Sequence, residues 1–334
     1  MIQNIKLSIC IPTYNRSFFL NSILHQLSGI EDEGIRDVIE VCISDNASTD
    51  DTEEMVTGWL NEGKVNIKYA KNLSNEGADR NYLKVVEMAT GCYCWLFGSD
   101  DLFVDNAIPM LLEKINESGS DIYICNRINC DINMNPIAKQ KWLKEGLFSQ
   151  EFDFKDPKEL LKYFENAESL GAVFSYLSSI IFKRSLWVSQ VFDNSYLGSA
   201  YAHVFYLLSM VKSGCTLSYV DHFLVLNRGG NESFLDKGSA NRILIDLFGY
   251  ARFADEFFYN TIYYDAFLNI LKNKERRQFR TIVSLRYYSL DEAEWERSKY
   301  ILAKLGYSNR LISFCSILKR PLKIIAETYL KGRM

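Results

Sequence analysis

The sequence contains few residues that build metal clusters, and it has no long apolar run. Its 334 residues include three histidines and eight cysteines, with no Cys-x-x-Cys pair and no Cys/His spacing typical of zinc. No apolar stretch reaches the roughly 18–20 residues that a helix needs to span a bilayer. The formal net charge of −4 gives no general attraction to nucleic acid. These absences argue against zinc-cluster, membrane-spanning and nucleic-acid-binding classes.

The cysteines are placed as small apolar residues. Cys10, Cys42, Cys94 and Cys125 fall inside segments that we expect to be strands. This usage is typical of the reducing cytosol, so we expect a cytoplasmic protein. Residues 1–6 lead directly into a strand, and we therefore expect no signal peptide before the fold.

Short β-rich runs alternate with helical patterns over residues 6–126. Expected strands are 6–11, 38–44, 65–70, 92–97 and 121–126, and expected helices are 17–27, 52–61, 78–89 and 106–117. This alternation predicts an α/β fold with a mostly parallel sheet that is flanked by helices. Further on, 171–182 and 217–227 are strand-like, and 201–212 is typical of a buried helix. The sequence around 129–136 is loop-like.

Polar residues follow four of these expected strands. They form the segments Pro12–Arg16, Asp45–Asp51, Asn75–Asn81 and Ser99–Asp101. Parallel sheets bind ligands beyond the carboxyl ends of their strands, where such segments come together. Ordinary turns would explain any one of them, but the four together predict a ligand-binding edge.

Asp100 and Asp101 directly follow an apolar, aromatic strand. Neighbouring carboxylates at the end of a buried strand repel each other and lose hydration. A divalent cation would relieve this cost, because Mg²⁺ typically binds one or two carboxylates together with substrate phosphate oxygens. The alternative is a helix start, where Asp is a favoured cap and complements the helix dipole.

The order of these segments resembles the family-2 glycosyltransferases of the GT-A fold. The matching segments are SICIPTYNR (8–16), VCISDNASTDDT (41–52), NEGADRN (75–81) and GCYCWLFGSDD (91–101). Later segments are similar to the abequosyltransferase branch, whose enzymes add a 3,6-dideoxyhexose to a bacterial O-antigen repeat unit. These are FSYLSS (174–179), GSAYAHVF (198–205), NRGGNESF (227–234) and RILIDL (242–247). The resemblance covers about residues 6–255.

The resemblance implies a donor-nucleotide site and a metal site. In it, Asp45 accepts a hydrogen bond from the base, Tyr14 contacts the base, and Asp101 binds Mg²⁺ or Mn²⁺ with help from Asp100. The implied nucleotide-binding residues are Pro12, Thr13, Tyr14, Arg16, Asp45, Asn75, Gly77, Arg80, Ser99, Asp100 and Arg228. For several of these a purely structural role stays open: a core-edge ring for Tyr14, a plain turn for Gly77, and surface charges for the arginines.

The general base is where this chain departs from the family pattern. Many inverting members carry an acidic pair at the start of the helix after the acceptor strand, and the matching positions here are Ala202 and His203. A neutral imidazole can accept a hydroxyl proton at neutral pH, so His203 is the candidate base. The alternative is a hydrogen-bonded histidine of the core. Asp193 is the reserve candidate.

The chain divides by character near residue 238. We expect a glycosyltransferase domain over 1–238, with a nucleotide half at about 1–126 and an acceptor half at about 127–238. Residues 239–334 are expected to be a helical region. Its segments 272–286 and 308–334 each hold six Lys or Arg against one Glu, with apolar residues between them. This pattern favours an anionic membrane surface as a partner; the alternative is a helical subdomain that packs its apolar face on the core.

These observations lead to one functional expectation and two alternatives. We expect sugar transfer, with inversion, from a nucleotide diphosphate donor such as CDP-abequose to a hydroxyl of a polyprenyl-diphosphate-linked oligosaccharide. It would take place on the inner face of the bacterial cytoplasmic membrane. The first alternative is a related protein that binds nucleotide sugar or glycan without turnover, and the Ala202-His203 departure is its support. A sugar nucleotidyltransferase would need a Gly-rich, Arg-containing loop after the first strand, which residues 12–16 do not supply.

Overall fold

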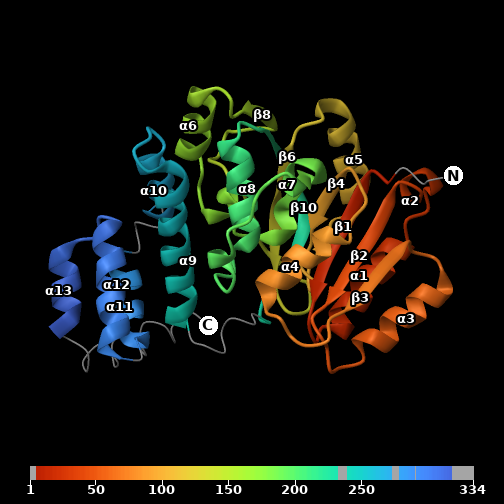
Figure 1. The fold of residues 1–334 in the computed structure, drawn as a ribbon, viewed down its shortest axis with the longest axis horizontal. Helices are drawn as coiled ribbons and strands as arrows, with labels where there is room; N and C mark the ends of the chain where they lie inside the picture. The colour runs from red at the N-terminus through yellow and green to blue at the C-terminus, as the bar shows by residue number, and fades with distance from the viewer. Residues whose placement is uncertain (1–4, 232–238, 273–277, 290, 318–334) are drawn as a thin grey trace. The chain divides into compact units, whose positions relative to one another are not determined.

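Strands and helices alternate along the first 130 residues, as expected (Figure 1). The structure is a computed structural model that describes residues 5–231, 239–272, 278–289 and 291–317. The elements of this first part are β1 (Leu7–Thr13), α1 (Ser17–Ser28), α2 (Glu33–Arg36), β2 (Ile39–Asp45), α3 (Thr52–Glu62), β3 (Ile67–Lys71), α4 (Ala78–Glu87), β4 (Tyr93–Leu96), β5 (Leu102–Phe103), α5 (Ala107–Ser118) and β6 (Ile122–Cys130). The chain forms two compact units, residues 1–231 and 232–334.

The elements that follow in the first unit mix short strands with short helices. They are β7 (Pro136–Gln140), β8 (Gln150–Asp153), α6 (Pro157–Glu165), η1 (Leu170–Val173), η2 (Leu177–Ser179), β9 (Ile180–Lys183), α7 (Arg184–Val188), η3 (Asn194–Tyr196), α8 (Ala202–Lys212) and β10 (Thr216–Arg228). The predicted buried helix over 201–212 is α8, and the predicted strand over 217–227 is β10.

One sheet organises the described part of this unit. Its strand order is β3-β2-β1-β4-β9-β6-β10-β5, with β7 beside β6 and β8 beside β10. β3, β2, β1 and β4 run parallel, as do β6 and β10. The α/β prediction is therefore confirmed, with one difference: β5, β7, β8 and β9 pair antiparallel, so the sheet is mixed.

Apolar strands explain why β1 and β2 form the centre of the sheet. Every residue of LSICIPT and of IEVCISD is buried, as expected for strands that are covered on both faces. An aromatic cluster continues this core under β4 and β5. The rings of Phe97 and Phe103 stack 4.0 Å apart, and Trp95 meets Phe103 edge-on at 5.1 Å. This core fixes the strand ends that carry the polar residues.

The predicted strand over 171–182 is wrong in its first three quarters. Residues 170–173 and 177–179 form 3₁₀ turns, and only Ile180–Lys183 is a strand. The backbone turns at Phe174, whose φ is +72°, a left-handed value that ends the first 3₁₀ turn. An apolar run of this length does not by itself distinguish a buried strand from buried turns.

The described residues of the second unit form helices, as the predicted helical C-terminal extension implies. Its elements are α9 (Ser239–Phe253), a π-helical turn η5 (Ala254–Phe258), α10 (Tyr264–Lys272), α11 (Gln278–Tyr288), α12 (Glu292–Lys304) and α13 (Asn309–Ile317). Aromatic side chains fill its core; Phe258 and Phe267, for example, lie 4.9 Å apart. Within the described residues, no helix has the length and apolar character needed to cross a membrane. Residues 318–334 of the predicted basic segment lie outside the described residues.

Candidate active site at the carboxyl ends of the strands

The turn after β4 is built around Asp101. A Cβ atom on Gly98 would lie only 2.9 Å from an Asp101 carboxylate oxygen, so the turn needs glycine there. Asp101 is 3% exposed. One oxygen of its carboxylate accepts hydrogen bonds from the Tyr176 and Ser178 hydroxyls. The other oxygen accepts hydrogen bonds, both 3.2 Å long, from the Asn227 side chain and the Arg228 backbone N–H. The protein therefore holds this carboxylate in one position.

Burial raises the pKa of Asp101 to about 6, and repulsion from Asp100 adds to this effect. The hydrogen bonds from Ser178 and Tyr176 act in the opposite direction, because they favour the carboxylate form. Asp101 is thus a carboxylate whose charge is sensitive to what binds beside it.

Asp100 lies between two arginines. Arg16 Nη1 is 2.7 Å from an Asp100 carboxylate oxygen, while Arg228 Nε donates to the Asp100 backbone carbonyl at 2.9 Å. Both guanidinium groups lie near the ring of Phe19, at 5.7 Å and 4.7 Å from its centroid. Arg228 also donates to the Ile132 carbonyl at 2.6 Å. Three of the predicted nucleotide-binding residues, Arg16, Asp100 and Arg228, therefore lie together.

A second polar group follows β1 and β2. Thr13 pairs with Asp45 in the sheet register, and both are buried. The Asp45 carboxylate accepts from the Ser48 N–H at 2.8 Å and from the Tyr69 hydroxyl at 2.7 Å. Burial and this hydrogen bond raise the pKa of Tyr69. Tyr14, by contrast, leaves 43% of its surface exposed, enough for contact with a ligand.

Asn46 organises the loop that carries Asn75 and Gly77. Its side-chain nitrogen donates to Asn75 Oδ1 at 2.8 Å. Its side-chain oxygen accepts hydrogen bonds from the Asn72 side-chain amide and from the Glu76 N–H. Gly77 has a φ of +87° and begins α4, so this turn requires glycine. Arg80 is exposed on the first turn of that helix. Sequence analysis gave Asn46 no role, although it stands beside Asp45 in the matching segment.

His203 and the two aspartates line the same cavity. This cavity has a volume of about 170 Å³. Its lining residues come from the turn after β4, from the loop before β9, from α4, from the start of α8 and from β10: Tyr82, Gly98, Asp100, Asp101, Ser175, Tyr176, Leu177, Ser178, Ala200, His203 and Asn227. The topology thus brings the candidate base to the candidate metal ligands from about 100 residues away.

The hydrogen bonding of His203 defines its tautomer. The side chain is 1% exposed, and Nε2 lies 3.0 Å from the Phe174 carbonyl oxygen. A carbonyl only accepts, so Nε2 carries the proton and Nδ1 carries the lone pair. Nδ1 is buried and has no hydrogen-bond partner among the described residues. Burial lowers the pKa of His203 to about 4, so the ring is neutral at neutral pH.

The reserve base, Asp193, lies elsewhere. It is exposed, accepts a hydrogen bond from the Ser195 N–H at 2.8 Å, and does not line the cavity of His203. Of the two candidates, His203 is the one beside Asp100 and Asp101.

Asp79 ties the nucleotide side of the site to the His203 side. It lies on the first turn of α4 and is 4% exposed. Its carboxylate accepts from the Ala200 N–H at 3.0 Å and the Ala202 N–H at 3.1 Å. Ala200 has a φ of +67°, a conformation that an L-residue rarely adopts. Asp79 therefore fixes the loop that enters α8 and places Ala200 at the cavity wall.

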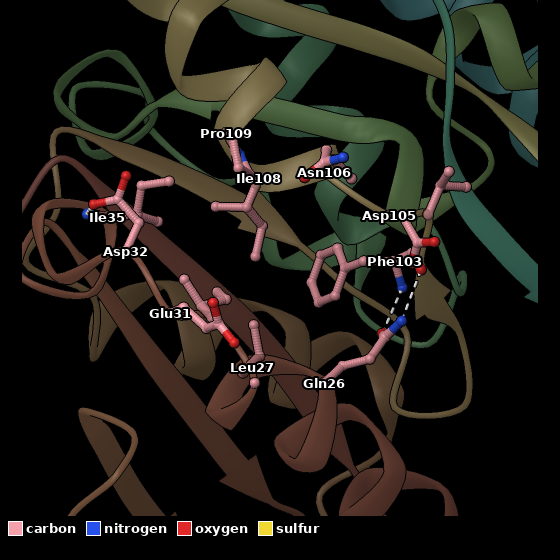
Figure 2. Close-up of a pocket in the computed structure, with 14 residues that line it drawn as sticks. Gln26, Leu27, Glu31, Asp32, Ile35, Phe103, Asp105, Asn106, Ile108 and Pro109 are labelled. Atoms are coloured by element: carbon pink, nitrogen blue, oxygen red, sulfur yellow. Dashed lines mark hydrogen bonds between the residues drawn. The ribbon is translucent and has the colours of Figure 1, made fainter.

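A larger cavity lies apart from these residues. Its volume is about 580 Å³, and it is formed by the end of α1, the segment 29–35 and the β5–α5 junction (Figure 2). Figure 2 shows Gln26, bonded to the backbone of Phe103, on one side of the cavity together with Asp105, and Glu31 and Asp32 on the other side. None of the predicted site residues lines this cavity.

The carboxylates fit a hard cation of the kind that GT-A enzymes commonly use. The described residues contain no group of three or more His, Cys, Asp or Glu side chains placed to hold a metal. Mg²⁺ needs only one or two carboxylates when phosphate oxygens complete its shell. Asp100 and Asp101 supply two, and Asp100 Oδ1 accepts no hydrogen bond from the described residues. The donor set is therefore compatible with a metal that shares a diphosphate.

Comparison with known proteins identifies the family. The sequence model of glycosyl transferase family 2 matches residues 8–180, which include the ends of β1, β2 and β4. The abequosyltransferase RfbV of Salmonella typhimurium is 39% identical over 92% of this chain and 91% of its own length. This chain belongs to glycosyltransferase family 2. As a member of that family it is a glycosyltransferase with a nucleotide-sugar donor.

More distant relatives agree with this assignment. The GalNAc(5)-diNAcBac-PP-undecaprenol β-1,3-glucosyltransferase of Campylobacter jejuni is 29% identical over 58% of this chain and 57% of its own length. The TarS 1–349 structure from S. aureus with UDP-GlcNAc has a TM-score of 0.61 at 16% identity, covering 98% of this chain and 92% of TarS 1–349. The structure of the mannosyltransferase PcManGT of Pyrobaculum calidifontis with GDP-Man and Mn²⁺ has a TM-score of 0.53 at 14% identity, and the match covers 99% of this chain and 88% of PcManGT. These structures confirm the fold of this family 2 glycosyltransferase.

Proposed function

We propose that this glycosyltransferase moves a 3,6-dideoxyhexose, such as abequose from CDP-abequose, to a hydroxyl of a polyprenyl-diphosphate-linked O-antigen oligosaccharide. The observation that carries the proposal is the shared cavity of Asp100, Asp101 and His203. It is supported by the likeness to the Salmonella abequosyltransferase along almost the whole chain. The volume of about 170 Å³ suits one small sugar unit, and the Tyr82, Leu177 and Ala200 walls suit a sugar with few hydroxyls.

The nucleotide would lie along the ends of β1, β2 and β4. Tyr14 presents an exposed ring for the base, and Asp45 lies at the end of β2 with Thr13 beside it. Arg16 and Arg228 bring two positive charges to Asp100, next to the position proposed for the diphosphate. The remaining proposed contacts are Pro12, Asn75, Gly77, Arg80 and Ser99.

Asp100 and Asp101 would hold Mg²⁺ or Mn²⁺ in this site. When bound, the cation supplies Lewis-acid stabilisation of the departing nucleoside diphosphate. The hydrogen bonds to Asp101 keep its carboxylate oriented. The Arg16 ion pair does the same for Asp100, so this chain positions both ligands before substrate arrives.

His203 is the proposed acceptor of the hydroxyl proton. In the transfer step the acceptor oxygen forms a bond to the anomeric carbon while the bond from that carbon to the phosphate oxygen breaks. The departing diphosphate keeps the electron pair, and the hydroxyl proton goes to His203 Nδ1, which has no partner among the described residues. The opposite side of the ring is fixed by the Phe174 carbonyl. Inversion at the anomeric carbon belongs to this proposal.

We further propose that the protein works at the inner face of the bacterial cytoplasmic membrane. All eight cysteines are free, which suits a reducing compartment. The segments 272–286 and 308–334 are basic and apolar, which suits an anionic surface that carries a lipid-linked acceptor. The name of the Campylobacter relative gives an undecaprenol-linked substrate for that enzyme.

Thermal shift measurements with CDP-, UDP-, GDP- and dTDP-linked ligands and Mn²⁺ test the donor. A ligand that binds only the native state stabilises it by about 2.7 kcal/mol at 100 times its Kd, so one base should stand out. Equal shifts for all four bases would contradict a selective nucleotide site. Release of nucleoside diphosphate in a donor hydrolysis assay then separates an enzyme from the alternative, a protein that binds nucleotide sugar without turnover.

A further inference from the structure

We propose that Arg127, on β6, binds a diphosphate group beside Asp101. The inference rests on the proposed function, because it takes these strand ends to be the substrate site. The sequence predicts a strand that ends at residue 126 and a loop around 129–136. In the structure β6 continues to Cys130, paired with β10 on one side and β7 on the other. That extension places Arg127 and Asn129 on one face of a strand.

Arg127 has no anionic partner in the described part of the chain. Its guanidinium carbon lies 4.1 Å from the ring centroid of Tyr176 and 5.2 Å from that of Trp142. Nε is buried without a hydrogen-bond partner among the described residues. The Tyr176 hydroxyl donates to Asp101 at 2.6 Å, so a single side chain separates this cation from the buried carboxylate.

Asn129 supplies a second unpartnered group on the same face. Successive side chains of a strand alternate in direction, so residues 127 and 129 share one face. Asn129 Oδ1 is buried and bonds to no described residue. In the parallel register Asn129 pairs with Asn227, whose amide donates to Asp101 at 3.2 Å. Asn129 Oδ1 is an acceptor and so does not bind phosphate oxygens itself, but its pairing places this face of β6, and Arg127 with it, beside Asn227 and Asp101.

The charges around the site point to a phosphate ligand. Arg16 forms an ion pair with Asp100, and Arg228 donates to two backbone carbonyls through Nε and Nη1. Arg127, by contrast, donates no hydrogen bond to any described residue, and its Nε is buried. An unpaired, partly buried guanidinium is costly, and its planar fork matches phosphate oxygens. The rings of Tyr176 and Trp142 hold that fork in place, which reduces the entropy lost on binding.

Two substrates of the proposed reaction carry this chemistry. One is the nucleoside diphosphate part of the donor, and the other is the diphosphate that links the acceptor oligosaccharide to its lipid. Because both present the same group, inorganic pyrophosphate can probe the site without a choice of donor base or acceptor.

Isothermal titration of the full-length protein with pyrophosphate and Mg²⁺ tests the proposal. Arg127→Gln should weaken pyrophosphate binding by about 10-fold or more, and Arg127→Lys should weaken it less, because it keeps the charge but loses the fork. Arg36→Gln, at an exposed arginine of α2, is the matched control and should leave binding unchanged. If Arg127→Gln does not fold, Asn129→Asp is the second test. It places a negative charge beside the phosphate and should also weaken pyrophosphate binding. No pyrophosphate binding by the wild-type protein, or equal affinities in wild type and folded Arg127 variants, would overturn the proposal.

Titrations with CDP and UDP then distinguish the two sources. If Arg127 holds the donor diphosphate, Arg127→Gln weakens binding of the preferred nucleoside diphosphate, and that nucleotide displaces pyrophosphate from the wild-type protein. If it holds the acceptor diphosphate, nucleotide affinity is unchanged and pyrophosphate binds together with the nucleotide. The binding measurement needs no turnover, so the two proposals can fail separately. If pyrophosphate binding depends on Arg127 but the protein has no transferase activity, the proposed function is contradicted and the role of Arg127 is not.

Discussion

At the scale of single residues, the site depends on how the chain holds its charged and polar groups without substrate. Asp101 is buried under four donors, and its pKa is raised to about 6. His203 is neutral because burial lowers its pKa to about 4. A buried carboxylate favours a cation beside it, whereas a buried neutral imidazole whose Nδ1 has no partner among the described residues favours a hydrogen-bond donor such as a hydroxyl.

Asp101→Asn should lower turnover by at least ~100-fold while the protein stays folded. The substitution removes the negative charge and turns one acceptor into a donor that faces the hydroxyls of Tyr176 and Ser178. Donor hydrolysis at saturating Mn²⁺ measures the effect. Asp105→Asn, an exposed position four residues later, should retain wild-type activity. Retained turnover in the Asp101 variant would remove this residue from the proposed metal site.

His203→Gln should lower the transfer rate by at least ~100-fold if Nδ1 receives the hydroxyl proton. His222→Gln, at an exposed position of β10, is the matched control. A loss of only a few-fold would assign His203 to the core.

The pH dependence of stability checks the environment of His203 separately. Its pKa is lower in the folded state than in the unfolded chain, so the unfolded state takes up the proton first. The stability of the wild type relative to His203→Gln should be highest above pH 6.5 and fall as the pH drops toward 4. Because the pKa is lowered from 6.5 to about 4, the wild type should lose about 3 kcal/mol of unfolding free energy relative to the variant over this pH range. Urea unfolding of both proteins at pH 7.5 and pH 4.5 measures it, and a constant difference would show that the ring is not held neutral.

At the scale of elements, α4 joins the two sides of the site. It carries Arg80 toward the proposed nucleotide and Tyr82 into the cavity wall, and Asp79 holds the loop before α8. Tyr201, the residue that caps α8, makes no side-chain capping bond of its own. Asp79 supplies that cap from another helix, so the start of α8 and the cavity wall move only if α4 moves.

Asp79→Asn should destabilise the protein by roughly 1–3 kcal/mol, because an amide nitrogen replaces one acceptor oxygen beside buried N–H groups. It should also raise the KM of the acceptor more than it weakens nucleotide binding. Urea unfolding and acceptor titrations measure the two effects. Asp51→Asn, at the start of α3 where the side chain makes no capping bond, is the control. Unchanged stability of the Asp79 variant would show that the loop is held by other contacts.

The same scale shows what a sequence can and cannot predict here. β1, β2 and β4 are buried apolar runs that end in polar turns, so their position and the residues at their ends follow from local pattern. β9 is different, because it enters the sheet antiparallel between β4 and β6, and no local pattern specifies that partner. Arg127 was missed for the same reason. Its strand is extended by pairing with β10, about 100 residues later.

At the scale of the whole molecule, an overall charge of −4 hides an uneven distribution along the chain. The first unit carries the site, and the helical unit carries the two basic segments. α13 packs Ile312 and Cys315 into its own unit, so part of the predicted basic segment belongs to a folded core. A truncation that keeps this helix must therefore end no earlier than Ile317.

Removal of residues 318–334 should therefore weaken binding to anionic vesicles while leaving the helical unit folded. The segment holds five Lys or Arg against one Glu, and each basic residue near an anionic surface contributes about 1 kcal/mol at low ionic strength. Co-sedimentation with vesicles containing anionic lipid, at low salt and again at 0.5 M salt (about a 4 Å screening length), measures the loss. Neutral vesicles are the control, since neither protein should bind them strongly. If the truncated protein sediments as well as the full chain, the attraction does not come from this segment, and the basic segment 272–286 becomes the next one to neutralise.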